Sequence, residues 1–321
     1  MPVPSTNVGM SDIQTEFGGS NPISLSEYYS GGPLVPSGAP APNGPIPSSG
    51  QIAIGQFRCA ENAVFVTATG GTITTSGDYK IHTFNSPGTF NVTCAGNAAG
   101  SDSIDYMVIA GGGGAGGDAG GGGGAGGFRA SAGTDGGGYN TGCAPRTNPV
   151  SPVPVSVQGY PITIGGGGGP GGGNCSNGQS GGTGSSSSGF SITSAGGGGG
   201  GSHPSGGGAT PGGNGGGAGR PTSPGPKSAA PGNNPPTSPP QGRPGSGVNG
   251  GGVTGAPGGT TSNITGGNVT RTRGGVRFTG HPQGTPGGAN TGSGGGGGSH
   301  TAGSSGGSGG SGVVIIRYKY Q

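Results

Sequence analysis

The residues that could carry acid–base or nucleophilic chemistry are few in this chain. Its 321 residues include nine acidic residues, all between Asp12 and Asp135. The closest acidic pair, Asp102 and Asp105, precedes an apolar run and is typical of a turn. Carboxylate catalysis of glycoside hydrolysis needs two acids facing one substrate, and no pair here has that context. We therefore predict no catalytic residue and no enzyme activity.

The histidines and cysteines predict no metal centre and no cofactor. His82, His203, His281 and His300 show no ligand spacing. We expect His82 on a strand surface, and His203 and His281, each followed by Pro, in loops. The cysteines are Cys59, Cys94, Cys143 and Cys175, whose separations of 35, 49 and 32 residues fit no zinc pattern. They are either free thiols or partners in one or two disulfides. No lysine follows Gly, which excludes a phosphate-binding GK[ST] loop.

Charge divides the chain into two unlike parts. Up to Asp135 there are nine acidic and three basic residues, whereas nine basic residues and no acid follow it. The formal net charge of +3 therefore hides an acidic first part and a basic second part. This asymmetry predicts different partners at the two ends, with an anionic partner for the second part. The positive residues are too sparse for a nucleic-acid site, so we expect no nucleic acid to bind.

Composition limits the elements that could position any site. With 93 Gly, 30 Pro and 25% hydrophobic residues, the chain cannot form one large ordinary globular domain. Residues 111–321 hold 78 of the glycines. We predict an insertion over 111–312 with three alternatives: a disordered tether, a collagen helix, or a packed lattice of polyglycine II helices. Collagen needs Gly at every third position, which the runs of five or six Gly break. We favour the lattice, because strands precede three of the glycine runs.

Short β-rich runs surround this insertion. They lie at 63–69, 71–75, 79–84, 89–94 and 104–109, with turn signals between them. The last residues, 313–321, are the most strand-like of all. We therefore predict an all-β fold with a small antiparallel β-sandwich at 51–110, which 313–321 completes. Strands near 160 and 190 are expected to join it.

Residues 1–50 are predicted to form an extended arm, since nine prolines disfavour helix and central strand. An internal repeat lies here: Ile23-Ser-Leu-Ser-Glu-Tyr28 recurs as Ile52-Ala-Ile-Gly-Gln-Phe57. We expect an arm of this kind to be unable to bury the apolar positions itself, so that they contact a neighbouring chain. The predicted attachment or oligomer contacts are Ile23, Leu25, Tyr28, Ile52, Ile54 and Phe57. The start of the chain lacks a basic and apolar leader, so we expect no secretory signal.

Larger residues between the glycine runs are predicted to lie in loops at the ends of the insertion. Loops on a rigid scaffold commonly carry binding sites, and arginine beside aromatic residues suits anionic or sugar ligands. The candidate receptor-binding residues are Phe128, Arg129, Tyr139, Arg271, Arg273, Arg277 and Phe278. The alternative is that these residues only make the module soluble.

The junctions between strands and glycine runs resemble a known group of proteins. Residues 79–92, 105–114, 160–165 and 312–318 are similar to segments of glycine-rich tail-fibre and receptor-binding proteins of tailed bacteriophages. The repeat at 23–28 and 52–57 also resembles a segment of phage virion proteins.

This resemblance implies a phage tail fibre or tail-tip adhesin that assembles in the host cytoplasm and is located in the virion. Its N-terminus would attach to other tail or baseplate proteins, and its distal loops would bind lipopolysaccharide or an outer-membrane protein. Such fibres are commonly trimeric, so a homotrimer is expected. A structural baseplate or tail decoration without receptor binding is the alternative, and a glycine-rich bacterial surface protein is a third possibility.

Overall fold

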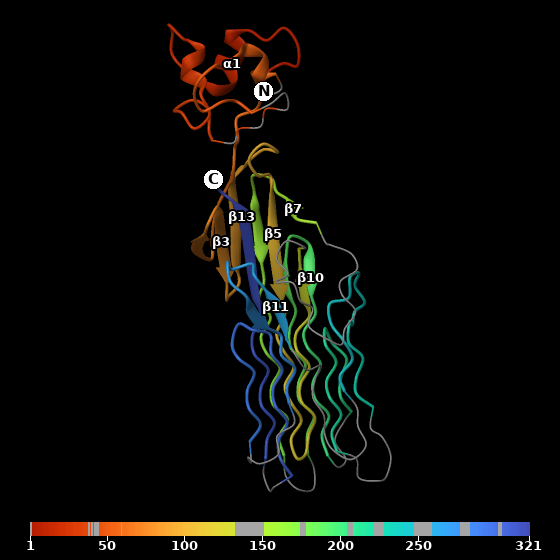
Figure 1. Ribbon diagram of the computed structural model, residues 1–321. Coiled ribbons are helices and arrows are strands. Elements are labelled where there is room, and N and C mark those ends of the chain that lie inside the picture. The colour runs from red at the N-terminus through yellow and green to blue at the C-terminus, as the bar shows by residue number, and fades with distance from the viewer. Residues whose placement is uncertain are drawn as a thin grey trace.

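A computed structural model describes residues 2–37, 39, 41, 45–58, 60–131, 151–173, 178–203, 208–220, 228–246, 259–276, 283–300 and 304–321. Three parts follow one another along a single long axis (Figure 1). A small N-terminal domain lies at one end, strands form the middle, and extended glycine runs form the other end. The predicted all-β class is confirmed, since the described strands pair into antiparallel sheets and α1 is the one α-helix among the described residues. Within those residues, no helix has the length and apolar character needed to cross a bilayer.

The described residues up to 60 form a compact domain with a core of its own, so the predicted extended arm is wrong. Helix α1 (Met10–Phe17) and two 3₁₀ turns, η1 (Leu25–Tyr28) and η2 (Ile54–Phe57), enclose the core. Fully buried side chains include Ile13, Tyr28 and Phe57. The Phe57 ring meets those of Phe17 and Tyr28 edge-on, at centroid distances of 6.3 and 6.1 Å. Proline excludes long helices, but it permits short turns that fold around apolar side chains.

The two copies of the internal repeat form the same local structure. In η1 the Glu27 carboxylate accepts the N–H of Ser24 at 2.9 Å, and in η2 the Gln56 amide oxygen accepts the N–H of Ala53 at 2.8 Å. Each acceptor therefore caps its own 3₁₀ turn and directs the following aromatic ring into the core. The repeat encodes a capped turn with a buried aromatic residue.

Two sheets form the sandwich. The smaller contains β1 (Val66–Thr69), β4 (Gly88–Ala95) and β8 (Gly159–Ile162) in the order β1-β4-β8. The larger contains β2 (Thr72–Ser76), β3 (Tyr79–Phe84), β13 (Val313–Lys319), β5 (Ser103–Ile109) and β6 (Phe128–Ala130), with β7 (Val153–Pro154) also paired to β5. Two separate hairpins pair β9 (Ser187–Gly189) with β10 (Ile192–Ser194), and β11 (Thr260–Ser262) with β12 (Val269–Arg271).

The last strand in the sequence lies in the centre of the larger sheet. Strand β13 is antiparallel to both β3 and β5, with Val314 opposite Phe84 on one side and Val108 on the other. Val314, Ile316 and Tyr318 point into the core between the two sheets, whereas Val313 and Ile315 belong to a second core on the opposite face. Both faces of β13 are thus buried, which explains why its sequence is continuously apolar rather than alternating.

His82 lies inside the sandwich core, contrary to its expected surface position. Its side chain is fully buried, with Nδ1 2.7 Å from the Gly70 carbonyl oxygen and Nε2 3.1 Å from the Tyr318 hydroxyl. That hydroxyl accepts the N–H of Ala68. The tautomer with a proton on Nδ1 satisfies every member of this network, because the carbonyl can only accept. Burial lowers the pKa of the imidazole below its ordinary value.

The glycine runs bond to one another with a period of three residues. We call these runs the glycine lattice: 110–127, 165–173, 178–186, 195–203, 208–220, 228–234, 241–246, 272–276, 283–300 and 304–312. The N–H groups of Gly111, Gly114 and Gly117 donate to 178–186, those one position later donate to 304–312, and those of Gly113 and Gly116 donate to 120–127. Three residues per turn without internal hydrogen bonds is typical of polyproline II geometry.

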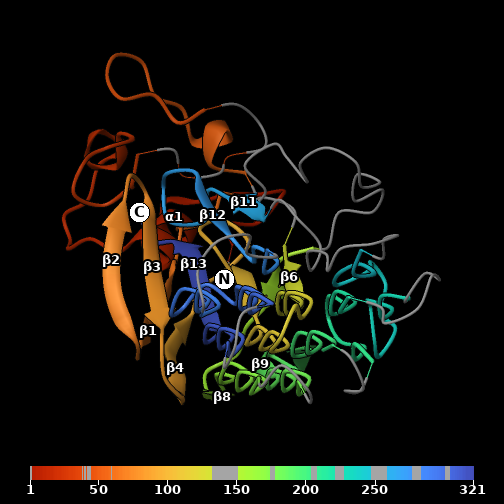
Figure 2. The ribbon, with the colours of Figure 1, turned by 90° about the horizontal axis from the view of Figure 1, so that it is seen from below.

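The run 110–118 is the centre of this packing. Its carbonyl oxygens accept from 165–173, 195–203 and 293–300, so that N–H and C=O groups together bond to six surrounding runs. Seen along the axis, the runs appear as coils packed side by side (Figure 2). The described lattice therefore satisfies its buried backbone polar groups through neighbouring backbone, as a sheet does, but in several directions at once.

Space, rather than backbone conformation, requires glycine in the lattice centre. A Cβ on Gly113 would overlap the carbonyl oxygen of Gly198, and one on Gly200 would overlap that of Gly121. Neither glycine has a left-handed φ. Ala115 and Ala125 are fully buried in the same runs, so a methyl group fits where the neighbouring backbone leaves room.

Candidate functional site

The six predicted attachment contacts lie in the N-terminal domain, but not as exposed anchors. Tyr28 and Phe57 are fully buried, and Ile23, Leu25, Ile52 and Ile54 pack against the same core. The Tyr28 hydroxyl donates to the Gly18 carbonyl oxygen at 2.8 Å. The prediction that a neighbouring chain must bury them is wrong for Tyr28 and Phe57, because the domain encloses both rings itself. Ile23, Leu25, Ile52 and Ile54 are partly buried, and a contact of these four with a partner stays a prediction.

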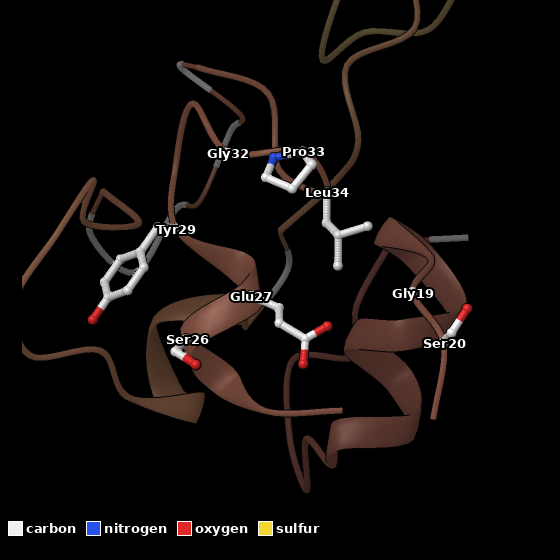
Figure 3. A pocket seen from close by; sticks show the side chains of 8 residues that line it. All are labelled: Gly19, Ser20, Ser26, Glu27, Tyr29, Gly32, Pro33 and Leu34. Atoms are coloured by element: carbon white, nitrogen blue, oxygen red, sulfur yellow. The ribbon is translucent and has the colours of Figure 1, made fainter. Parts of the chain in front are cut away.

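A recess of about 580 Å³ opens on the surface of this domain (Figure 3). Its lining consists of Gly19, Ser20, Ser26, Glu27, Tyr29, Gly32, Pro33 and Leu34. The Glu27 carboxylate already accepts the Ser24 N–H that caps η1. Glu27 is the one carboxylic acid among its lining residues, so the recess holds no acid–base pair of carboxylates.

Two predicted receptor-binding residues belong to a strand and not to a loop. Phe128 and Arg129 lie in β6, where Phe128 pairs with Ile109 and Arg129 with Val108. Phe128 is 1% exposed and belongs to the second core of the larger sheet. The prediction of Phe128 as a binding residue is wrong, because its ring is enclosed next to the sandwich.

Arg271 is the last residue of β12, and the β11–β12 hairpin lies beside the sandwich rather than at the far end of the lattice (Figure 1). Arg273 follows in the lattice run 272–276, where its carbonyl oxygen accepts the N–H of Gly294. Burial lowers the pKa of the Arg271 guanidinium, and Ile264 of the same hairpin packs into the second core. Arg273 is exposed. Tyr139, Arg277 and Phe278 lie outside the described residues.

The end of the lattice that lies away from the sandwich brings together three ionisable side chains that the sequence did not predict to meet. Asp118 and Ala119, with φ of 47° and 49°, form the turn that ends the central run. Asp118 Oδ1 lies 2.9 Å from His300 Nδ1, and Oδ2 lies 3.7 Å from His203 Nδ1. The imidazole rings meet edge-on with centroids 5.1 Å apart. We call these three residues the distal cluster.

Burial differs strongly among the three side chains. Asp118 is 0% exposed, His203 13% and His300 48%. Among the described residues, the buried atoms Asp118 Oδ2 and His203 Nδ1 have no hydrogen-bond partner. The cluster is thus closed on the lattice side and open beside His300. Among the described His, Cys, Asp and Glu side chains, it is the one group whose ligand atoms are close enough to bind a single metal ion.

Equal run lengths bring the distal cluster together. Gly295 donates to Gly113, which is 182 residues earlier, and His300 is likewise 182 residues after Asp118. Asp118 and His203 each lie eight residues after the alanine that opens a run, Ala110 or Ala195. Runs that have the same length per residue and begin at the same height along the long axis also end at the same height. Counting along each run from its strand could have brought Asp118 and His203 together, because β5 and β10 end directly before their runs. His300 ends a run that follows a turn rather than a strand, so its position could not be counted in this way.

The fold and this distal site define a glycine-rich structural module mounted on a β-sandwich. A family model described as a glycine-rich domain matches residues 83–319, most of the chain. The chain belongs to this glycine-rich domain family. A search of the curated proteins finds no match.

Proposed function

We propose that this protein is a phage tail fibre or tail-tip adhesin, with its N-terminal domain attached to other tail proteins and the distal end of the lattice directed to the host surface. The observation that carries the proposal is the position of the two ends. The N-terminal domain and the far ends of the glycine runs lie at opposite ends of the long axis (Figure 1). Such a protein can hold one partner at each end without the two interfering.

Rigidity supports the same proposal. Backbone hydrogen bonds in several directions join the runs of the lattice. Three of the run ends continue directly, without a linker, into strands of the sandwich, which begin or end at Ile109, Phe128 and Val313. Loops presented by such a scaffold keep their positions relative to one another, which lowers the entropy cost of binding. The acid-free part of the chain beyond Asp135 favours an anionic host surface, such as lipopolysaccharide.

Competition for phage adsorption tests this proposal. The purified full chain should block adsorption of its phage to host cells in a concentration-dependent way. Absence of competition at saturating protein would contradict receptor binding and favour a structural tail or baseplate component.

Two exposed valines provide a matched test of which end binds. Val276 is 49% exposed, and its carbonyl oxygen accepts the N–H of Gly297 near the distal turn. Val269 is 38% exposed on β12 beside the sandwich. Val276→Asp adds a negative charge where an anionic surface would approach and should weaken competition, whereas Val269→Asp should leave it unchanged. Equal effects of both variants would contradict distal binding.

A further inference from the structure

We propose that the distal cluster is a binding site for a divalent transition-metal ion of the zinc class. Asp118, His203 and His300 each offer one ligand atom, and these atoms all lie within 4.8 Å of one another. Two imidazoles and one carboxylate with an open fourth position is a ligand set found in zinc sites. The inference concerns the protein itself and does not depend on its proposed role in adsorption.

The distances suit such an ion. Ligand atoms bonded to tetrahedral zinc at about 2.0–2.1 Å lie about 3.4 Å from one another. His300 Nδ1 lies 2.9 Å from Asp118 Oδ1 and His203 Nδ1 lies 3.7 Å from Asp118 Oδ2, one distance slightly shorter and one slightly longer than that value. The two nitrogens face different oxygens of the same carboxylate, so a single ion bound by one oxygen requires the carboxylate to turn toward both. Small side-chain rotations would therefore bring both imidazole nitrogens to one ion.

Unsatisfied buried atoms point to a missing ligand at this place. Asp118 Oδ2 and His203 Nδ1 are buried, and no described residue forms a hydrogen bond with either atom. A carboxylate fully removed from water is costly unless it is paired or bound to a metal. The contact of Oδ1 with His300 satisfies only one side of the carboxylate. A cation between the three side chains would satisfy both orphaned atoms at once.

The lattice builds the space for this carboxylate. The N–H of Asp118 donates to the Ser304 carbonyl oxygen at 3.1 Å, which fixes the turn. A Cβ on Gly178 would lie 3.1 Å from the Cβ of Asp118, and one on Gly173 would lie 2.9 Å from its backbone nitrogen. The run ends thus leave room for an aspartate and hold it in one position, as a preorganised ligand requires.

Ligand chemistry selects among cations. Imidazole nitrogen suits zinc, copper, nickel and iron, whereas calcium and magnesium prefer oxygen ligands. Ligation uses the Nδ1 lone pair of each neutral imidazole, so His300 would carry its proton on Nε2 in the metal-bound form and lose its hydrogen bond to Asp118. The fourth position would face the open side of His300 and accept water or an anionic group.

Metal titration of the full chain, freed of metal by a chelator, tests this inference. Zinc alone should bind at one site per chain and raise the melting temperature, since binding to the folded state stabilises it. Calcium should do neither. The inference would be overturned if zinc did not bind, or if it bound without the distal cluster. The cluster would then be a set of hydrogen-bonded side chains that closes the turn at the end of the central run.

Two variants assign the site, and a third is the matched control. Asp118→Asn keeps the shape and removes the charge, and His300→Ala changes a side chain that is 48% exposed and tolerates truncation. Each should lower zinc affinity at least about tenfold, because loss of a ligand should cost no less than loss of an outer-shell group that only orients a ligand. Asp78→Asn makes the same change at an exposed turn and should bind zinc as the unaltered chain does. If Asp118→Asn does not fold, the zinc affinity of His300→Ala tests the inference alone. An unaltered zinc affinity in that variant would overturn the inference.

Discussion

The β-sandwich and the glycine lattice satisfy their backbone hydrogen bonds in similar ways, but they are stabilised by opposite features of the sequence. In the sandwich, side chains such as Phe90, Tyr106 and Ile316 fill the space between two sheets. In the lattice, the neighbouring backbone occupies the positions that side chains would take, as at Gly113. The sandwich therefore depends on side chains that are present, and the lattice on side chains that are absent.

The largest expected effect of a single methyl group is in the lattice centre. Gly113→Ala places a Cβ against the carbonyl oxygen of Gly198, where backbone must move in two bonded runs. We expect the loss in unfolding free energy to reach or exceed the upper end of the range of about 1–3 kcal/mol that overpacking typically costs, because backbone rather than a side chain must move. Thermal and denaturant unfolding measure it. Gly169→Ala is the matched control, since no atom lies within 4 Å of its added Cβ. Similar stability of the two variants would contradict a lattice limited by space.

The sequence predicts the strands far better than the N-terminal domain. The runs at 79–84 and 104–109 correspond to β3 and β5, because alternation and turn residues act locally. The sequence does not predict the N-terminal domain, because its core joins residues that are far apart in the sequence, among them Ile13, Tyr28 and Phe57. The high proline content suggests an extended chain and gives no sign of the turns that bring these residues together. A high proline content indicates the absence of long helices, not of a core.

The distal cluster shows what sequence reasoning lacks. Each of its residues looks like an isolated loop residue, and a sequence separation of 182 residues between Asp118 and His300 gives no local signal that they meet. Their proximity follows only once the runs are known to be parallel to one axis and equal in length. Likewise, Phe128 follows a glycine run like a loop tip, but its pairing with Ile109 places it in a sheet.

The second prediction concerns the loss of a large side chain from the core of the sandwich. Ile316 is fully buried in the centre of β13, so Ile316→Ala leaves a cavity and should cost about 2–5 kcal/mol of unfolding free energy. Ile73 on β2 is 46% exposed, and Ile73→Ala should change stability by less than about 0.5 kcal/mol. Denaturant unfolding of both variants gives the difference. A small effect at Ile316 would show that the lattice holds the sandwich together without its core.

The third prediction is a pH dependence that belongs to the sandwich. Burial lowers the pKa of His82 in the folded protein, so the unfolded chain binds a proton at a higher pH than the folded one. The stability from neutral His82 is fully present above the ordinary histidine pKa of about 6.5 and is lost as pH falls below it. We expect the melting temperature to decrease between pH 7 and pH 5.

His82→Gln isolates this contribution, because an amide can donate to Gly70 and accept from Tyr318 without titrating. The variant should show a weaker decrease over the same pH range, even if it is less stable at pH 7. An equally steep decrease would assign the pH dependence to other groups.

The smallest expected effect has the opposite sign and tests whether space alone selects glycine. Gly169 is exposed, has no left-handed φ, and offers open space to a Cβ. Gly169→Ala should therefore stabilise the protein by about 0.4–1 kcal/mol, because alanine restricts the unfolded chain more than glycine does. Its carbonyl oxygen would keep the hydrogen bond from Gly182. Precise denaturant midpoints can resolve a shift of this size. Destabilisation here would mean that the lattice requires glycine even where there is room, and that backbone freedom, not close approach, separates it from the sandwich.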